Sequence, residues 1–297
     1  MNKKEFAIGE LYYINELEVS ILLREIYGLD AYLRDFLTLD ANSVVFDIGA
    51  NIGIFSLYAL YQCDEQAKIY SFEPIPATFE CLRNNLAPFA DKVQVYNMGI
   101  GNVPEECTVE FTLFGAATAT ATYRPEDKII SNFQPQLNYD TLLKLSSRRD
   151  RKLYYLLKYL PFLRKYLIKK NYTKRTTSHK VLCKLESLGR FIEKNHIDHI
   201  DFLKVDVEGA EFEVIKSIFP QQFATIKQLA IEVHDIEHRV EQITAFLKEK
   251  GYEIKIYRSP VMERLGFNHH MVYAKQKSHF SKPSFNGSNP RLTRAQT

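Results

Sequence analysis

The segment at residues 43–57, SVVFDIGANIGIFSL, constrains the fold more than any other part of the sequence. It begins with a β-branched apolar run at 44–46, which is typical of a strand buried on both faces. Asp47 stands where this strand should end, and Gly49 and Gly53 form a turn before a helical apolar pattern starts. Strand, glycine turn and helix in this order place a ligand on backbone N–H groups at a helix N-terminus.

The composition of this turn distinguishes two cofactors. A dinucleotide-binding loop carries glycine at alternate positions so that the backbone can approach a pyrophosphate, whereas Asn51 occupies the middle glycine position here. The carboxylate of Asp47 would repel a pyrophosphate, but it suits a cofactor that carries an ammonium and a sulfonium group. The turn therefore favours S-adenosylmethionine over NAD, and a tight turn without any ligand remains as the third interpretation.

Composition limits the class of protein. With 297 residues, of which 45% are hydrophobic, the chain can bury a full core, and one large α/β domain with additions is expected. The net charge of +3 is too small to indicate nucleic-acid binding by itself. Cys63, Cys81, Cys107 and Cys183 form no C-x-x-C pair, which fits reduced thiols and makes a zinc site unexpected. Because we find neither a signal peptide nor a run of about 18 apolar residues, we expect a soluble, cytoplasmic protein.

Strand and helix patterns alternate along most of the chain. Strand patterns lie at 44–46, 68–73, 93–95, 201–207, 229–233, 252–257 and 270–275. Helical patterns lie at 77–86, 185–193 and 237–250, and Gly251 follows the last as a C-cap signal. This alternation predicts a parallel, doubly wound sheet. Glu73 ends the second strand roughly 20 residues past the glycine turn, where an acidic side chain can accept hydrogen bonds from ribose hydroxyls.

Other regions lie outside this repeat. Residues 10–38 carry helical apolar stripes with a break at 28–30 and a second short helix at 31–37, which predicts a helical cap over residues 1–42. This cap either packs on the core or covers the cofactor as a lid. The stretch at 109–113 is expected to be an antiparallel addition, and residues 115–180 form an insertion in a domain that spans 43–277. Residues 278–297 are polar and basic, so we expect a disordered tail.

The insertion contains a strongly basic stretch. Residues 148–175 interleave lysine and arginine with leucine and tyrosine around the single acid Asp150, which predicts a basic amphipathic helix pair broken at Pro161. Three interpretations remain open. The helices pack on the core with a solvated outer face, they dock on an acidic partner protein or an anionic membrane surface, or they contact RNA. Nucleic acid is the least favoured partner because no recognisable RNA-binding module accompanies the stretch.

Four motifs, in this order and spacing, resemble the FkbM family of S-adenosylmethionine-dependent methyltransferases. They are FDIGANIGIFS, YSFEPIPATFECLRNNL, FLKVDVEGAEFEVIKSI and LAIEVHD, and the resemblance covers residues 44–101 and 185–274. It implies a Rossmann-like, seven-stranded, mostly parallel sheet (the class I methyltransferase fold) with a reversed final hairpin. It also implies O-methylation of a hydroxyl on a natural product or sugar. The N-terminal stretch is similar to members associated with non-ribosomal peptide and polyketide assembly, so the acceptor is expected to be a small or carrier-bound molecule.

The resemblance also implies which residues bind the cofactor. Asp47, Gly49, Asn51 and Gly53 would hold the methionine part, Glu73 would hold the ribose, and Asn97 with the turn that ends at Gly101 would lie by the adenine.

Catalytic candidates stand at the ends of two later strands. Asp206 and Glu208 follow the strand at 201–207, at the carboxyl end where open α/β sheets bind ligands. His234 ends the next strand and titrates near neutral pH, so it is the candidate base, although a strand-end histidine can equally serve only the structure. A divalent metal held by Asp206, Glu208 and either Glu232 or Asp235 is a further option, but we expect no metal.

Two other functions remain open. A NAD-dependent oxidoreductase is disfavoured by Asn51 and by the carboxylate ahead of it. A non-catalytic adaptor that docks through the basic insertion has no physical need for Asp47, Glu73 and both turn glycines together. Glu211 and Glu213 are expected to act only in the first turn of a helix, where the helix dipole favours acidic side chains.

Overall fold

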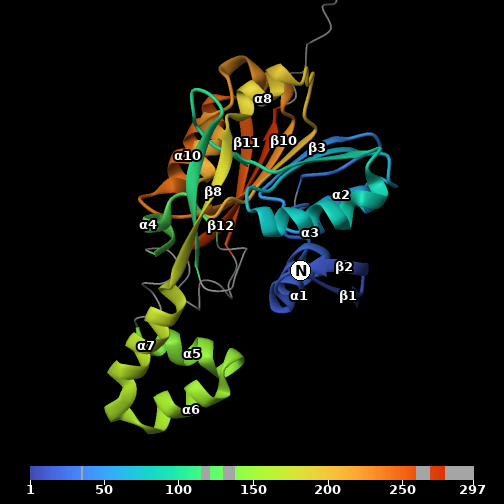
Figure 1. The fold of residues 1–297 in the computed structure, drawn as a ribbon. Helices are drawn as coiled ribbons and strands as arrows, with labels where there is room; N and C mark the ends of the chain where they lie inside the picture. Colours follow the sequence, from blue (N-terminus) through green and yellow to red (C-terminus); the bar gives the residue numbers. More distant parts are fainter. Residues whose placement is uncertain (35, 115–120, 130–137, 259–267, 278–297) are drawn as a thin grey trace, which may run out of the picture.

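The computed structural model describes residues 1–34, 36–114, 121–129, 138–258 and 268–277 (Figure 1). Its central sheet contains β3 (Val44–Ile48), β4 (Lys68–Phe72), β5 (Val93–Tyr96), β9 (Phe202–Val205), β10 (Gln228–His234), β11 (Tyr252–Arg258) and β12 (His269–Gln276). The strand order is β11-β12-β10-β9-β3-β4-β5. β12 runs antiparallel to both β10 and β11, and all other neighbouring strands pair in parallel, so the predicted mostly parallel sheet with a reversed final hairpin is confirmed.

Helices cover both faces of this sheet because successive side chains of each strand point to opposite sides. The helices are α2 (Ile54–Gln62), α3 (Pro76–Leu86), α8 (Leu188–Lys194), α9 (Glu211–Lys216) and α10 (Arg239–Glu249), with 3-10 turns η2 (Ala87–Phe89) and η7 (Pro220–Thr225). Val45 and Phe202 belong to the core that includes α2 and α3. Their neighbours Phe46 and Leu203 belong to the core that includes α8, α9 and α10. The buried strands are therefore apolar on both sides, as the run at 44–46 predicts.

The N-terminal segment differs from the prediction. It forms a hairpin of β1 (Asn2–Phe6) and β2 (Gly9–Tyr13), then α1 (Glu16–Leu23) and a π-helical turn η1 (Arg24–Gly28). The helices predicted at 10–38 are therefore wrong for β2 and for the described residues of 31–37, and right for 16–28. The cause is alternation in β2, where Leu11 and Tyr13 are buried against the core. The backbone N–H and carbonyl of Tyr12 both bond the side-chain amide of Asn85 on α3, which fixes the strand in place.

A second, smaller sheet carries the insertion away from the core (Figure 1). It contains β6 (Gly99–Ile100), β7 (Cys107–Phe114) and β8 (Ser178–Glu186), with β7 antiparallel to β8, so the antiparallel addition predicted at 109–113 is confirmed. The helix predicted at 185–193 begins only at α8, because the residues before it form β8. The cause is again alternation, since Cys183 and Leu185 are buried between the exposed Lys180, Leu182 and Lys184.

The insertion contains the short helix α4 (Pro125–Lys128), which lies beside the central sheet, and a group of helices at the far end of the β7–β8 ribbon (Figure 1). The far group contains α5 (Tyr139–Arg149), α6 (Arg151–Tyr159), a 3-10 turn η6 (Pro161–Leu163) and α7 (Arg164–Thr176). The predicted break at Pro161 is confirmed, since α6 ends before this proline and α7 starts after it. Among the described residues, no helix is long and apolar enough to cross a membrane. The predicted disordered tail at 278–297 lies outside the described residues.

Candidate functional site

The turn between β3 and α2 adopts a backbone geometry that its glycines permit. Gly49 has φ +78° and lies so close to β9 that a Cβ atom there would sit 1.8 Å from the carbonyl oxygen of Asp206. Gly53, at φ +92°, precedes α2, and its Cβ would meet the Leu82 side chain at 2.9 Å. Asn51 lies between them at φ +52°, a left-handed conformation that asparagine tolerates better than most residues. Other residues at the two glycine positions would be strained, so the turn depends on this sequence.

Asp47 lies beneath the turn and is fully buried. Its Oδ2 accepts a hydrogen bond of 2.7 Å from the Ser56 hydroxyl, and its Oδ1 lies 3.1 Å from the ammonium of Lys204. Lys204 also donates to the carbonyl of Gly49 at 2.7 Å and lies 3.8 Å from a carboxylate oxygen of Asp206. Burial alone would lower the pKa of Lys204, but the two aspartates hold it above its ordinary value. The ion pair therefore ties β3, the turn and β9 together. Contact of Asp47 with a cofactor stays a prediction.

Glu73 follows β4 and faces the same turn. Its carboxylate oxygens accept hydrogen bonds from the backbone N–H groups of Asn51, at 3.1 Å, and Ile75, at 2.9 Å. Burial raises the pKa of Glu73 to about 8, although both N–H groups act in the opposite direction. The Asn97 side chain donates to the carbonyls of Glu73 and Pro74, at 3.0 Å each, and so fixes the chain at this point. The structure thus brings Asn51, Glu73 and Asn97 together, as the sequence predicts.

Gly101 lies further along the chain, against the small sheet. Its N–H donates to the carbonyl of Glu186 at 3.0 Å, and a Cβ atom there would approach the Tyr123 hydroxyl to 2.9 Å. A side chain at this position would require the Tyr123 hydroxyl and the Leu185 side chain to shift. Its predicted position by an adenine is not tested by the described contacts.

A buried tyrosine joins two acids at the ends of β9 and β10. The Tyr32 hydroxyl donates to Asp206 at 2.9 Å and lies 3.3 Å from a carboxylate oxygen of Glu232. Its ring packs edge-on against Phe55 of α2. Burial, with the nearby charge of Asp206, raises the pKa of Glu232 to about 8. The N-terminal segment therefore supplies a side chain to the carboxyl edge of the sheet.

His234 lies between two carboxylates and is almost completely buried, with 1% exposed. Its Nε2 lies 3.0 Å from Glu208 and its Nδ1 lies 3.0 Å from Glu211. Burial alone would raise the pKa of Glu211, but His234 and the N–H of Gly209 hold it below its ordinary value. Arg239 donates to the Gly209 carbonyl at 2.7 Å and lies 3.9 Å from Glu211. Of the predicted trio, Glu208 and His234 thus meet at the ends of β9 and β10, whereas Asp206 contacts Tyr32 and Lys204.

Three residues of this arrangement are not among the predicted site residues. Lys204 stands in a buried strand, and only its place between Val205 and other apolar residues in FLKV could have signalled a buried ion pair. Tyr32 lies in the N-terminal stretch, outside the four motifs, and no local pattern there marks it as a partner of two acids. Glu211 lies in the first turn of α9 as expected, but it is fully buried against His234. Its predicted first-turn position is confirmed, and the contact with His234 is a further role that was not predicted.

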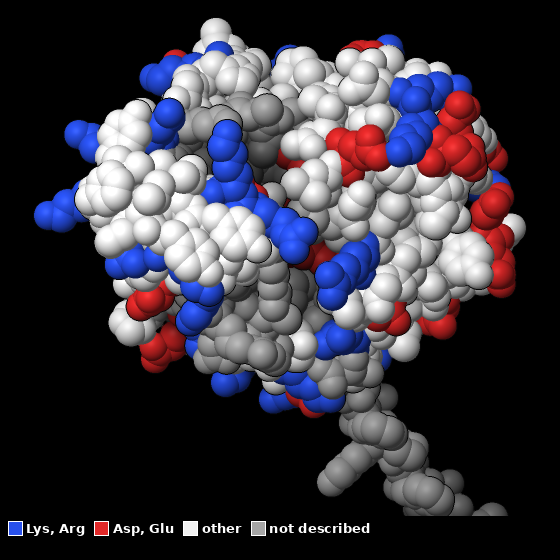
Figure 2. Space-filling view, turned by 90° about the horizontal axis from the view of Figure 1, so that it is seen from below, with Lys and Arg blue, Asp and Glu red and all other residues white. Residues whose placement is uncertain are grey.

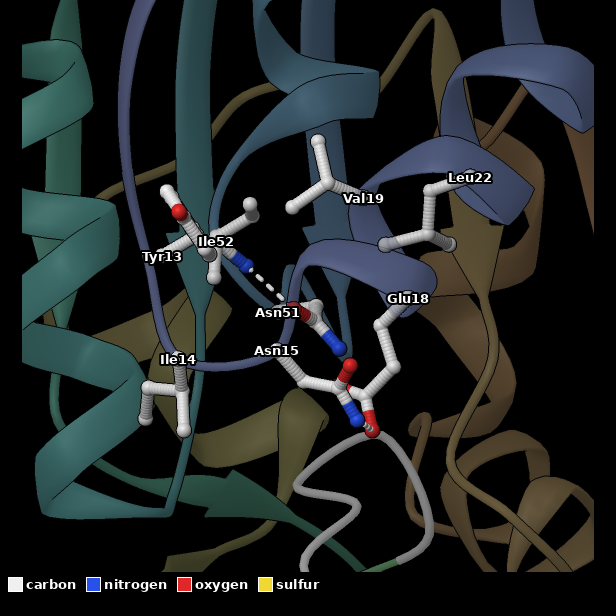
Figure 3. Close-up of a pocket in the computed structure, with 8 residues that line it drawn as sticks. All are labelled: Tyr13, Ile14, Asn15, Glu18, Val19, Leu22, Asn51 and Ile52. Atoms are coloured by element: carbon white, nitrogen blue, oxygen red, sulfur yellow. Dashed lines mark hydrogen bonds between the residues drawn. The ribbon is translucent and has the colours of Figure 1, made fainter. Parts of the chain in front are cut away.

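A small hollow opens beside the glycine turn (Figure 3). It is open to solvent and is lined by Tyr13, Ile14, Asn15, Glu18, Val19, Leu22, Asn51 and Ile52. Most of these residues belong to the N-terminal segment, which therefore covers the turn. The hollow has no enclosed space even for a water molecule, so it is a surface depression and not a cofactor pocket.

The acidic residues of the optional metal site have other partners. Asp206 contacts Tyr32 and Lys204, Glu208 contacts His234, and Asp235 accepts the N–H of Val240 at the start of α10. Among the described residues, no group of three histidine, cysteine or acidic side chains is arranged to hold a metal ion.

The sequence matches the family model described as the methyltransferase FkbM domain over residues 47–254, which is more than half of the chain. This range includes the glycine turn, Glu73 and His234. The chain belongs to the FkbM methyltransferase family. It is therefore an S-adenosylmethionine-dependent methyltransferase, which decides between the methyl donor and NAD.

Two of the relatives are similar in length to this chain, and a third is far longer. The 31-O-demethyl-FK506 methyltransferase FkbM of Streptomyces tacrolimicus is 26% identical over 274 residues, which cover 89% of this chain and 92% of that protein. Methyltransferase sdnD of Sordaria araneosa is 28% identical, with 82% of this chain and 85% of that protein covered. The AMB antimetabolite synthetase AmbE of Pseudomonas aeruginosa is 27% identical over 88% of this chain, which spans only 12% of that protein. A solved FkbM methyltransferase from Methylobacillus flagellatus KT aligns at a TM-score of 0.45 and 14% identity, over 80% of this chain and 45% of that chain.

The site of this FkbM methyltransferase fits its cofactor in charge and in hydrogen bonding. Each carboxylate oxygen of Glu73 accepts one backbone N–H, which leaves lone pairs for the hydroxyls of a ribose. The acidic side chains of Asp206 and Glu232 meet at the Tyr32 hydroxyl, and in their ionised form they would suit the ammonium and sulfonium of S-adenosylmethionine.

Proposed function

We propose that this FkbM methyltransferase transfers the methyl group to a hydroxyl of a small molecule, either free or bound to a carrier. The relative from Streptomyces tacrolimicus is named for an oxygen position of FK506, which supports an oxygen acceptor. The observation that carries the proposal is the chain of side chains formed by Glu208, His234 and Glu211, with both ring nitrogens 3.0 Å from a carboxylate. It stands where open α/β sheets bind their ligands.

The exposed fractions of these three side chains indicate what each of them does. Glu208 has a side chain that is 22% exposed, whereas those of His234 and Glu211 are 2% and 0% exposed. Glu208 therefore meets the acceptor, and His234 stands behind it. Glu211 keeps its negative charge because its pKa is held low, so it orients the imidazole and stabilises a proton on it. The predicted base His234 thus acts through Glu208.

The protein's part in the reaction is alignment and proton removal. Bound S-adenosylmethionine supplies a methyl group that its sulfonium activates for an in-line displacement. The buried Asp47–Lys204 pair and the glycine turn keep one side of the site rigid, and Tyr32 with Asp206 borders the other side. As the acceptor oxygen bonds to the methyl carbon, the bond from that carbon to sulfur would break, and the proton of the acceptor hydroxyl would pass to the Glu208–His234 pair. Proton removal of this kind contributes about 10²–10⁴-fold to the rate.

The test is to compare matched acceptors. Sugar, macrolide and peptide compounds would be offered in pairs that differ only in a hydroxyl or an amine at one position, with labelled S-adenosylmethionine. We expect the label on the hydroxyl members. Label on the amines alone would overturn O-methylation.

Variants test the proton route separately. His234→Asn and Glu208→Gln should each lower kcat by about 10²–10⁴-fold, while the affinity for S-adenosylhomocysteine, measured by calorimetry, stays unchanged. His196→Asn is the matched control, because His196 is exposed and its φ of +52° suits asparagine. Full activity in both site variants would exclude the proposed route.

A further inference from the structure

The helices α5, α6 and α7 with η6, residues 139–176, form a lobe that stands apart from the catalytic domain. The β7–β8 ribbon carries this helical lobe below the sheet (Figure 1). The carboxyl end of β10 points to this same lower side of the sheet (Figure 1). Arg239, which follows β10, donates a hydrogen bond of 2.9 Å there to the carboxylate of Asp127 in α4. The helical lobe and the carboxyl edge of the sheet therefore face the same side of the molecule.

The helical lobe has its own small core. Leu142 of α5 and Leu157 of α6 are 1% and 0% exposed. The Arg164 guanidinium lies over the Tyr139 ring at 4.4 Å, and its Nε donates to the carbonyl of Leu157 at 2.9 Å. The apolar side of α6 therefore packs within the helical lobe, and the opposite side of the helix faces solvent.

The outer face of α6 combines bases with aromatic rings. With about 3.6 residues per turn, Arg151, Lys152, Tyr155, Lys158 and Tyr159 fall on one side of the helix, and all five are exposed. The rings of Tyr155 and Tyr159 stack with their centroids 6.1 Å apart. In the view from below, the left-hand part of the surface, where the helical lobe lies, shows blue side chains around white ones (Figure 2).

The same chemistry continues around the tip of the lobe. Phe162 in η6 is 78% exposed and Tyr166 is 60% exposed. Lys165, Lys169 and Lys170 of α7 are exposed beside them. No aspartate or glutamate occurs in the sequence from 151 to 177, so no acid of this stretch offsets its bases.

These features fit one kind of partner better than the others. Lysine is depleted in the cores of protein–protein interfaces, and stacking of RNA bases usually takes place in a groove, whereas these rings stand on the outside of helices. Tyrosine favours the headgroup level of a bilayer, phenylalanine is typical of the membrane-facing side of interfacial helices, and lysine and arginine attract anionic lipids.

We propose that the helical lobe docks on an anionic membrane surface. Phe162 and the tyrosines enter the headgroup layer, and the lysines lie against the lipid phosphates. The proposal rests on the lobe alone and is independent of the acceptor in the proposed methyl transfer.

Vesicle sedimentation with the full chain tests this proposal. Vesicles of phosphatidylcholine mixed with phosphatidylglycerol should sediment the protein, vesicles of phosphatidylcholine alone should not, and added salt should weaken binding. Lys152→Gln combined with Lys158→Gln should weaken partitioning by about 30-fold, from the usual contribution of each base near a charged bilayer. Tyr159→Ser combined with Phe162→Ser should also weaken partitioning to the vesicles. The relative loss should be larger at high salt, because salt screens the lysines and leaves more of the binding to the aromatic side chains.

The matched control removes the same charge elsewhere. Lys194→Gln combined with Lys248→Gln changes exposed lysines of α8 and α10, outside the lobe, and should bind as the unchanged protein does. Unchanged binding of S-adenosylhomocysteine by every variant would show that the fold is intact. Failure of the unchanged protein to sediment with anionic vesicles at low salt would overturn the proposal. Equal loss in lobe and control variants, or binding to single-stranded RNA or polyglutamate but not to vesicles, would overturn it too.

Discussion

Replacement of Lys204 by methionine tests the buried ion pair beneath the glycine turn. The side chain of Lys204 is 4% exposed and that of Asp47 is 0% exposed, with 3.1 Å between the charged groups. Methionine keeps a similar length but leaves Asp47 without its cation and the Gly49 carbonyl without its donor. Loss of one partner of a buried pair costs about 3–5 kcal/mol, because the other charge stays buried and uncompensated. We expect the free energy of unfolding to fall by this amount.

Urea denaturation measures this loss against a matched control. Lys227 forms an ion pair of 2.6 Å with Asp201, but its side chain is 60% exposed, so Lys227→Met should cost at most about 1 kcal/mol. Asp47→Asn added to Lys204→Met should recover part of the loss by removing the stranded charge. Since the pKa of Lys204 is raised in the folded protein, its contribution is present at neutral pH and disappears only at strongly alkaline pH. Equal losses for Lys204→Met and Lys227→Met would refute the argument that burial controls the cost.

Three further predictions concern other parts of the site. Because burial raises the pKa of Glu73 to about 8, and the ionised form accepts ribose hydroxyls better, affinity for S-adenosylhomocysteine should rise between about pH 6 and 9. Calorimetry with Glu73→Gln should show a flatter pH dependence, and an identical slope would contradict this role. Gly49→Ala should abolish cofactor binding or folding, because its Cβ would overlap the Asp206 carbonyl, whereas Gly251→Ala, at φ +90° in open space, should cost only about 1 kcal/mol. Tyr32→Phe removes a hydrogen bond to a carboxylate, so thermal unfolding should show a loss of about 1.5–3 kcal/mol; an unchanged midpoint would contradict it.

Local sequence patterns were sufficient for the first strand–turn–helix unit and for the strands of the central sheet. The apolar run before Asp47, the two glycines and the helical pattern after them each reflect short-range geometry, so β3, the turn and α2 could be predicted together. Glu73 and His234 could be placed because a strand pattern ends at each of them. Parallel strands then bring these ends to one edge of the sheet.

Contacts between distant segments could not be predicted in the same way. The hydroxyl of Tyr32 meets Asp206 and Glu232 only after the N-terminal segment has folded over the sheet. Lys204 is identified as buried only when β9 is placed beside β3, since a lysine within a strand pattern usually faces water. β8 was missed because its alternation runs directly into the helical pattern of α8, and the boundary between the two depends on pairing with β7.

The close approach of Gly49 to Asp206 has a consequence for the order in which ligands bind. The turn that faces the methyl donor and the strand end that faces the acceptor meet through this backbone contact, and Lys204 bonds both. A shift of either segment therefore moves the other. We expect the two ligands to bind cooperatively, so that each raises the affinity for the other by the same factor, as thermodynamic linkage requires. Titration of one ligand at fixed concentrations of the other would measure that factor.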